Sequence, residues 1–246
     1  MNAMGRGSFE NTVVTAPCDC DPLSGLTPSA ALRFLQDAAT AGTETSGLGH
    51  DELYDRYGLV FVVAAHAVRF FRPVFPGETV TVHTDPMGTR GAHFFRQTLF
   101  TAPDGTLLIE AQTDWSLIDA ASGRPQRATA YPGVLDVPGE WKPFCDPSRL
   151  NLPAADSPCG EHLVTRADTD ENRHMNNTVY AKLMTDCFSD KPSFPIEEFC
   201  LRYQRQAREG EAIALSRAVL PGGVHAASGT IGGSVCFTAA FSPFRT

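Results

Sequence analysis

Hydrophobic and polar positions in residues 27–119 follow first the period of a helix and then that of strands. Thr27 is a typical N-cap, Pro28 suits a first helical turn, and the next apolar positions recur every three or four residues. These positions are Ala31, Phe34, Leu35, Ala38 and Ala39. Four segments rich in β-branched and aromatic residues follow, at 59–71, 78–84, 93–100 and 106–119. The pattern predicts one helix followed by an antiparallel meander.

A second unit repeats this plan after a break in the pattern. Six prolines between 131 and 160 interrupt any period and predict a linker. Beyond it, apolar positions in 176–188 share one helical face. Strand-like segments then follow at 197–206, 211–220, 224–228 and 230–241. We therefore expect an N-terminal domain over 1–130, a linker over 131–160 and a C-terminal domain over 161–246.

Short landmarks pair across the two halves in the same order. Residues 69–78 resemble 202–211, and residues 104–106 resemble 228–230. The spacing between paired landmarks shrinks toward the C-terminus, so the copies differ in loop length, and 42–58 has no counterpart of similar length. Internal repetition of this kind indicates a duplicated fold. A long helix wrapped by an antiparallel sheet, present twice, predicts an α+β fold of the tandem hotdog type.

Composition and charge exclude several classes of function. The 246 residues carry a net charge of −8, and no basic run is interleaved with aromatic residues, which argues against nucleic acid as a partner. No apolar run approaches the length of a membrane helix, and residues 1–10 lack a secretory pattern, so we expect a cytoplasmic protein that does not enter a membrane. The seven cysteines are scattered without metal-ligand spacing, so neither a metal nor a cofactor is expected.

The segment DENRHMNN, residues 170–177, concentrates hydrogen-bonding side chains just before the second helix. One of its last two asparagines can cap that helix. Asp170, Asn172 and His174 are spaced by two, which would place them on one side of an extended segment. There His174 can act as general base, Asp170 can orient its ring or attack directly, and Asn172 can stabilise an oxyanion. The alternative is a polar turn that satisfies its own hydrogen bonds.

Residues 170–180, DENRHMNNTVY, resemble the D-x-N-x-H-x-N-N-x-x-Y signature of acyl-acyl carrier protein (acyl-ACP) thioesterases. Segments 32–39, 70–80 and 115–127 are also similar to the family in order and spacing, so the resemblance covers most of 9–241. It implies hydrolysis of a fatty acyl thioester on acyl carrier protein, with the catalytic groups in the second hotdog and the acyl pocket mainly in the first. The catalytic residues it implies are Asp170, Asn172 and His174. We expect Asn177 and Gln206 to support them, and Phe34, Leu35, Ala38 and Ala39 on the first helix to line the acyl pocket; the alternative is that these four residues only pack against their own sheet.

The sequence departs from the family at one place. Plant members have a glutamate followed by a cysteine where this chain has Gln206 and Ala207, which removes one carboxylate that could activate water. For the carrier, we expect docking at Arg202, Arg205 and Arg208, beside the motif; the alternative is that they are solvated arginines at the edge of a strand. We expect a monomer or a homodimer. The alternatives are an acyl-CoA thioesterase, a hotdog hydratase or dehydratase, for which no motif is present, and an acyl-binding protein with a weakened site.

Overall fold

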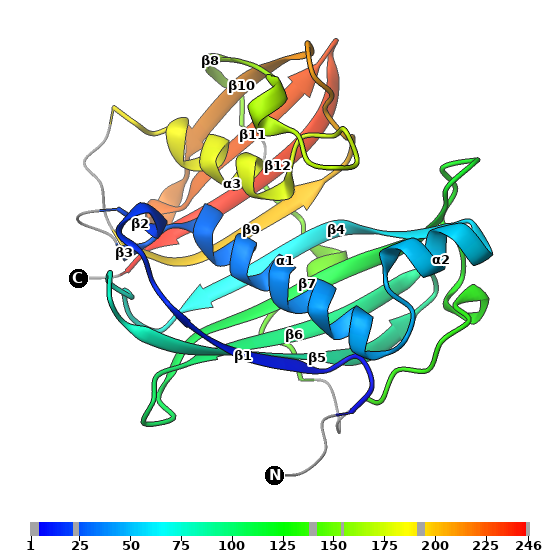
Figure 1. Ribbon diagram of the computed structural model, residues 1–246. Helices are drawn as coiled ribbons and strands as arrows, with labels where there is room; N and C mark the ends of the chain where they lie inside the picture. Colours follow the sequence, from blue (N-terminus) through cyan, green and yellow to red (C-terminus); the bar gives the residue numbers. More distant parts are fainter. Residues whose placement is uncertain (1–4, 22–24, 138–141, 154, 191–194, 245–246) are drawn as a thin grey trace.

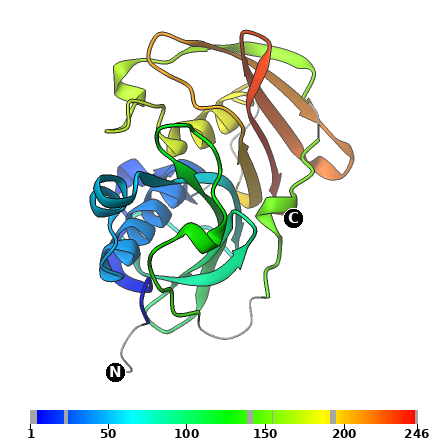
Figure 2. The same cartoon turned by 90° about the vertical axis from the view of Figure 1, so that its right-hand side faces the viewer.

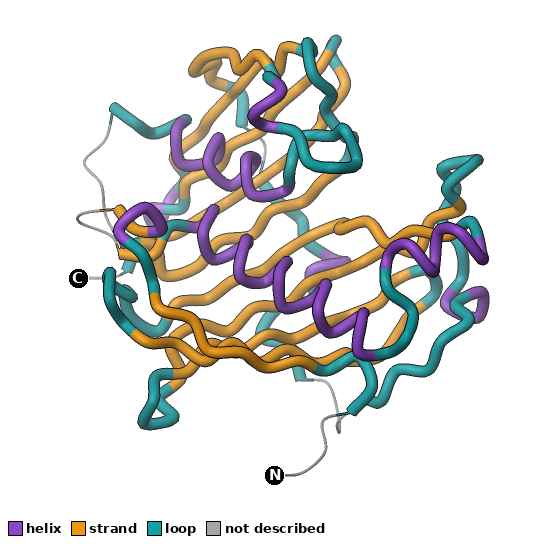
Figure 3. The backbone as a smooth tube through the Cα atoms, viewed as in Figure 1, coloured by secondary structure: helices purple, strands orange, loops and turns teal. Residues whose placement is uncertain are grey.

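The computed structural model describes residues 5–21, 25–137, 142–153, 155–190 and 195–244. Ten strands form one antiparallel sheet in the order β1-β5-β6-β7-β4-β9-β12-β11-β10-β8. The two long helices, α1 and α3, lie on the same face of this sheet (Figure 1). Figure 3 shows the same division into one strand layer and one helix layer.

The first half contains two helices and five strands of the large sheet. They are β1 (Phe9–Val14), α1 (Pro28–Thr45), α2 (His50–Tyr57), β4 (Leu59–Phe70), β5 (Thr79–Arg90), β6 (His93–Thr101) and β7 (Leu107–Asp119). The second half contains β8 (Ser157–Leu163), α3 (Asn177–Asp186), β9 (Ile196–Tyr203), β10 (Ala212–Val219), β11 (His225–Ile231) and β12 (Ser234–Pro243). A small hairpin of β2 (Cys20–Asp21) and β3 (Gly25–Leu26) and short 3₁₀ turns, η1 (Pro17–Asp19), η2 (Ala128–Ala130), η3 (Pro147–Arg149), η4 (Arg166–Asp168) and η5 (Pro221–Gly223), complete the elements.

The strand order is the same in the two halves when each is read outward from the centre of the sheet. β4, β7, β6, β5 and β1 lie on one side, and β9, β12, β11, β10 and β8 lie on the other. Each half has one long helix, preceded in the chain by its outermost strand. This symmetry confirms the predicted duplication and the tandem hotdog fold.

α1 forms where the helical pattern predicted it. The Thr27 hydroxyl accepts a hydrogen bond from the Ala30 N–H at 3.2 Å, which caps the helix. The apolar face of α1 is buried against the sheet. The rings of Phe34 and Phe100 meet edge-on there, with their centroids 6.5 Å apart. At its start, the Ser29 hydroxyl donates to the Thr178 carbonyl in α3 at 3.0 Å, so the two helices meet near their N-termini.

The halves join through antiparallel pairing of β4 with β9. Arg69 and Glu198 are paired in register, and the Arg69 guanidinium donates two hydrogen bonds to Glu198 Oε2, at 2.8 and 3.0 Å. The same guanidinium lies 4.3 Å from the ring centre of Phe144, which belongs to the connection between the halves. One arginine therefore links both central strands to that connection.

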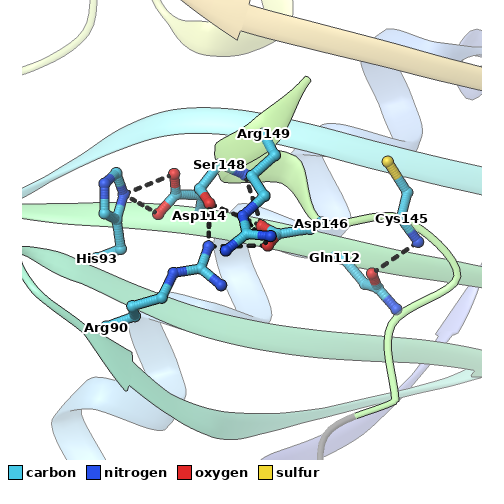
Figure 4. A network of polar contacts seen from close by, with 8 residues as sticks. All are labelled: Arg90, His93, Gln112, Asp114, Cys145, Asp146, Ser148 and Arg149. Atoms are coloured by element: carbon cyan, nitrogen blue, oxygen red, sulfur yellow. Dashed lines mark hydrogen bonds and ion pairs between the residues drawn. The ribbon is translucent and has the colours of Figure 1, made fainter. Parts of the chain in front are cut away.

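Residues 142–153 of the connection, with η3, lie against β4 and β7 on the face opposite the helices (Figure 2). His93 Nδ1 lies 2.9 Å from both carboxylate oxygens of Asp114, and Arg90 pairs with Asp146 at 2.8 Å (Figure 4). Residues 138–141 and 154 of the expected linker lie outside the described residues. β8 begins at Ser157, inside the segment expected to be linker.

In the large sheet, two strands and one predicted break differ from the expectation. The outermost strands, β1 and β8, were not predicted, since each pairs with one neighbour and carries little apolar alternation. The predicted break at Gly229 is wrong, because β11 continues through it to Ile231. A side chain at Gly229 would collide with Phe237 and Ile213, so this glycine serves close packing within the sheet.

Candidate active site

Residues 169–175 form a tight hairpin rather than the extended segment that the sequence suggested. Thr169 and Met175 pair as an antiparallel bridge, and the Asp170 N–H donates to the His174 carbonyl at 3.0 Å. The Arg173 N–H donates to the Asp170 carbonyl at 2.9 Å, and Arg173 has a φ of 61°. This is a turn followed by one left-handed residue, a common three-residue hairpin loop.

The hairpin changes the relation among the three predicted catalytic residues. Asp170 and His174 lie opposite each other at its neck, and opposite residues in an antiparallel pair face the same side. Asn172 lies at the exposed tip, where its N–H donates to Asp170 Oδ1 at 2.9 Å. The structure thus brings Asp170 and His174 together and places Asn172 at the rim.

One backbone hydrogen bond fixes the hairpin to the connection between β9 and β10, and a second bond fixes that connection to α3. The Met175 N–H donates to the Ala207 carbonyl at 2.8 Å, and the Ala207 N–H donates to the Tyr180 hydroxyl at 3.1 Å. Ala207, at the position of the family's cysteine, is fully buried. The motif and the segment that departs from the family are therefore direct neighbours.

Of the two candidate asparagines, Asn176 caps α3. Its Oδ1 accepts hydrogen bonds from the Thr178 N–H at 2.9 Å and the Thr178 hydroxyl at 2.8 Å. Asn177 is the first residue of α3, is half-buried, and accepts a hydrogen bond at its carbonyl from the Tyr203 hydroxyl at 3.2 Å. Asn177 thus contacts β9 through its backbone carbonyl.

The environment of His174 favours its neutral form. Burial of the half-buried ring and the positive charge of Arg208 lower the pKa of His174, while the charge of Asp170 acts in the opposite direction. A neutral imidazole can accept a proton, which is what a general base requires.

A shallow depression lies beside the hairpin, lined by Arg205, Gln206, Arg208 and Glu211. Glu211 accepts hydrogen bonds from Arg205 Nη2 at 2.5 Å and from the Arg208 N–H at 2.8 Å. Gln206 is exposed. Its neutral amide occupies the sequence position at which plant members of the family have a glutamate. Sequence reasoning missed Glu211, whose carboxylate belongs to this depression but is held by Arg205.

The three arginines expected to dock the carrier have different surroundings. Arg202 donates to the Leu150 carbonyl in the connection between the halves at 3.1 Å. Arg205 is bound to Glu211 and to the Ile231 carbonyl. Arg208 is exposed and has no side-chain hydrogen bond or ion pair within the described ranges. Of the three, Arg208 has the guanidinium available for a partner.

The residues expected to line the acyl pocket are buried on α1. Phe34, Leu35 and Ala38 pack in the main core, whereas Ala39 also lines a cavity between α1 and the sheet. Aromatic rings of Phe61, Phe94 and Tyr131 surround this cavity, with centroids 4.9 to 5.6 Å apart. No local sequence pattern predicts this cavity, because its walls come from α1, β4, β5, β6, β7 and the segment after β7.

The described residues contain no group of three or more His, Cys, Asp or Glu side chains that could hold a metal ion. No helix in this same part of the chain has both the length and the apolar character needed to cross a bilayer.

Two family models match this chain, one in each half. Residues 15–137 match the family model of the thioesterase-like superfamily, and residues 154–228 match that of the acyl-ACP thioesterase C-terminal domain. No curated protein sequence gives a significant match.

Solved structures share the whole fold at low sequence identity. An acyl-ACP thioesterase from Bacteroides thetaiotaomicron superposes with a TM-score of 0.85 at 18% identity, over 96% of this chain and 97% of that one. The 12:0-ACP thioesterase from Umbellularia californica superposes with a TM-score of 0.76 at 18% identity, over 98% of each chain. With the fold and both family models in agreement, the chain belongs to the thioesterase-like superfamily and is a thioester hydrolase with a tandem hotdog fold.

Proposed function

We propose that the protein hydrolyses fatty acyl thioesters carried by acyl carrier protein, with Asp170 and His174 as the catalytic pair. The observation that carries this proposal is the hairpin, which sets the two residues opposite each other beside the start of α3. The lowered pKa of His174 supports its role as a base near neutral pH. The match to the acyl-ACP thioesterase C-terminal domain and the names of the two structural relatives support the carrier.

In the proposed reaction, neutral His174 removes a proton from water as the water oxygen attacks the thioester carbonyl. The carbonyl oxygen becomes an oxyanion, and Asn172 stabilises it by donating a hydrogen bond from its amide. The C–S bond then breaks, the fatty acid forms, and the imidazolium returns its proton to the leaving thiolate of the carrier. Asp170 stabilises the imidazolium and orients the ring.

Two further parts of the site complete the proposal. The α1 face with Phe34, Leu35, Ala38 and Ala39 borders the path of the acyl chain. Arg208, exposed beside the hairpin, binds the acidic carrier. Asn177 and Gln206 support the site from α3 and from the depression.

The test is hydrolysis of acyl-ACP thioesters from short to long chains by the wild type, His174→Ala and His50→Ala. His50 is an exposed histidine on α2, so its replacement controls for the loss of an imidazole elsewhere. We expect His174→Ala to lower kcat by on the order of 10² or more, and His50→Ala to match the wild type. Equal activity in all three proteins would refute the assignment. Parallel assays with acyl-CoA thioesters of the same chain lengths show whether acyl carrier protein or coenzyme A is the preferred carrier.

A second candidate function is acyl binding without turnover. The exposed amide of Gln206, in place of the family's carboxylate, favours it. It predicts that the wild type binds acyl-ACP but does not release fatty acid. Release of fatty acid by the wild type that is lost in His174→Ala would exclude this candidate.

A further inference from the structure

The side chain of Cys200 in β9 faces the connection between the two halves. Gln112 of β7, Ala67 of β4 and Cys200 lie opposite one another in consecutive strand pairs, so their side chains share one face of the sheet. Their neighbours in the chain pack in the main core on the helix side, and they are Ala111, Val68, Phe199 and Leu201. The shared face is therefore the one against which residues 142–153 lie.

The connection places a second thiol, that of Cys145, over this row of side chains. The amide of Gln112 is hydrogen-bonded to the backbone at Cys145. Figure 4 shows the sulfur of Cys145 pointing away from Gln112 and toward β4. In β4 the row contains Ala67, which is fully buried and whose single methyl group leaves room for a sulfur. The thiols of Cys145 and Cys200 meet there and are hydrogen-bonded to each other.

A positive charge is fixed beside these two sulfurs. The guanidinium of Arg69 binds Glu198, which precedes Cys200 by two residues and therefore lies on the same face of β9. It also lies 4.3 Å from the ring centre of Phe144, which directly precedes Cys145. Arg69 is thus held from both of the segments that carry the thiols.

The two thiols differ in exposure and in acidity. Cys145 is half-buried, whereas Cys200 is 9% exposed. The hydrogen bond from Cys200 and the charge of Arg69 lower the pKa of Cys145. Burial of Cys145 and the charges of Glu198 and Asp146 act in the opposite direction. The same hydrogen bond and burial raise the pKa of Cys200, so Cys145 is the thiol that ionises first.

We propose that Cys145 and Cys200 form a site of reversible oxidation, at which a hydroperoxide converts the two thiols into a disulfide that fastens the connection to β9. Cys145 reacts with the peroxide, because it is the more exposed thiol. Cys200 then resolves the product, because it already contacts that sulfur. The site lies on the face of the sheet opposite α1 and α3, so this assignment does not depend on the proposed function.

In the proposed reaction, the Cys145 thiolate attacks one oxygen of hydrogen peroxide, so that an S–O bond forms and the O–O bond breaks. The hydroxide that leaves takes up the proton lost by Cys145 and departs as water, and Cys145 becomes a sulfenic acid. The Cys200 sulfur then attacks the Cys145 sulfur, the S–S bond forms, and hydroxide leaves with the Cys200 proton as water. Overall, two thiols lose two electrons and two protons, and one peroxide is reduced to two waters.

The disulfide constrains a large part of the second half. The loop that it closes contains β8, the hairpin of residues 169–175 and α3. A cross-link over a long loop reduces the conformational freedom of the unfolded chain. The oxidised protein should therefore resist unfolding more strongly than the reduced protein.

The experiment treats the reduced full-length protein with hydrogen peroxide, blocks the remaining thiols with iodoacetamide under denaturing conditions, and maps the peptides by mass spectrometry. We expect the peptides that contain Cys145 and Cys200 to be joined, with a mass decrease of two hydrogen atoms that dithiothreitol reverses. Tm should rise by roughly 5–10 °C on oxidation and return after reduction.

Single serine variants separate the roles of the two thiols. In Cys200→Ser the sulfenic acid of Cys145 has no resolving thiol, so it should persist and be trapped by dimedone. In Cys145→Ser the buried thiol of Cys200 should stay reduced. Cys18→Ser, at an exposed cysteine, should form the disulfide and show the same change in Tm as the wild type.

The mapping of the wild type tests the proposal even if a variant fails to fold. If Cys145 and Cys200 are both recovered as free thiols at a peroxide concentration that oxidises Cys18, the proposal is wrong. A disulfide that joins Cys145 to a different cysteine, or a stable dimedone adduct of Cys145 in the wild type, would also overturn it, because either result excludes Cys200 as the resolving thiol.

Discussion

The N–H of Met175 donates to the carbonyl of Ala207 at 2.8 Å, which binds the hairpin of residues 169–175 to the connection between β9 and β10. Met175 follows His174 in the chain and Ala207 precedes Arg208, so this bond fixes the backbone beside His174 to the backbone beside Arg208. The charge that lowers the pKa of His174 therefore comes from a segment held at a constant position relative to the ring.

Arg208→Gln should move the acid limb of the pH profile of kcat/KM to higher pH. The positive charge of Arg208 disfavours the imidazolium, so its removal raises the pKa of His174 and leaves less of the neutral base at low pH. Arg166→Gln, a substitution at an exposed arginine of η4, should leave the limb in place. An acid limb that is the same in wild type and Arg208→Gln would show that His174 is not the titrating base.

Arg208→Glu should impair turnover of carrier-linked substrate more than turnover of the matching coenzyme A thioester, because acyl carrier proteins are acidic. The assay is run at about pH 8, where a histidine is neutral whether or not Arg208 is present. Arg208→Lys, which keeps the charge, should retain most of the carrier preference. An equal loss on both thioesters would reject docking at this residue.

Asn176→Ala should lower the free energy of unfolding by about 1 kcal/mol, because it removes the cap of α3. Asn176→Asp keeps an oxygen that can accept the hydrogen bond from the Thr178 N–H, so its free energy of unfolding should fall much less. Urea unfolding of the three proteins makes the comparison. Equal stability of the alanine and aspartate variants would mean that the cap contributes nothing.

His66 should make the protein sensitive to acid. It is buried at the junction of the halves, 3.1 Å from the Thr113 hydroxyl, and burial lowers the pKa of His66 from 6.5 to about 3. The unfolded chain then binds the proton more tightly than the folded chain. The contribution of neutral His66 to the free energy of unfolding is therefore full above pH 6.5 and falls as the pH drops toward 3.

His66→Gln should therefore show a flatter loss of stability over that pH range, measured by urea unfolding at several pH values. His50→Gln, on the surface of α2, should follow the wild type. A pH dependence that is identical in His66→Gln and wild type would exclude His66 as its source.

Local signals in the sequence were enough for the main elements of the fold. Thr27 and Pro28 mark the start of α1, and the periodicity that follows predicted its buried face. The edge strands β1 and β8 escaped prediction, because a strand that pairs on one side only needs little apolar alternation.

The site was predictable in composition but not in shape. Asp170 and His174 were grouped through an assumed extended segment, whereas a hairpin brings them together. That hairpin depends on the left-handed backbone of Arg173, and arginine gives no signal for this conformation, unlike glycine or asparagine. The cavity around Arg96, Trp115 and Tyr131 is assembled from distant segments, so no local pattern could reveal it.

The pairing of β4 with β9 joins two hotdogs whose residues can be substituted independently, because each hotdog has its own stretch of a single chain. In a symmetric dimer of identical subunits, each substitution appears in both copies. A substitution that enlarges the pocket in one subunit therefore also changes the surroundings of the catalytic residues in the other subunit. Here the half with α1 can acquire a cavity while the half with α3 keeps its hairpin. Under the proposed function, chain fusion thus allows acyl-chain selection and bond cleavage to evolve independently on one scaffold.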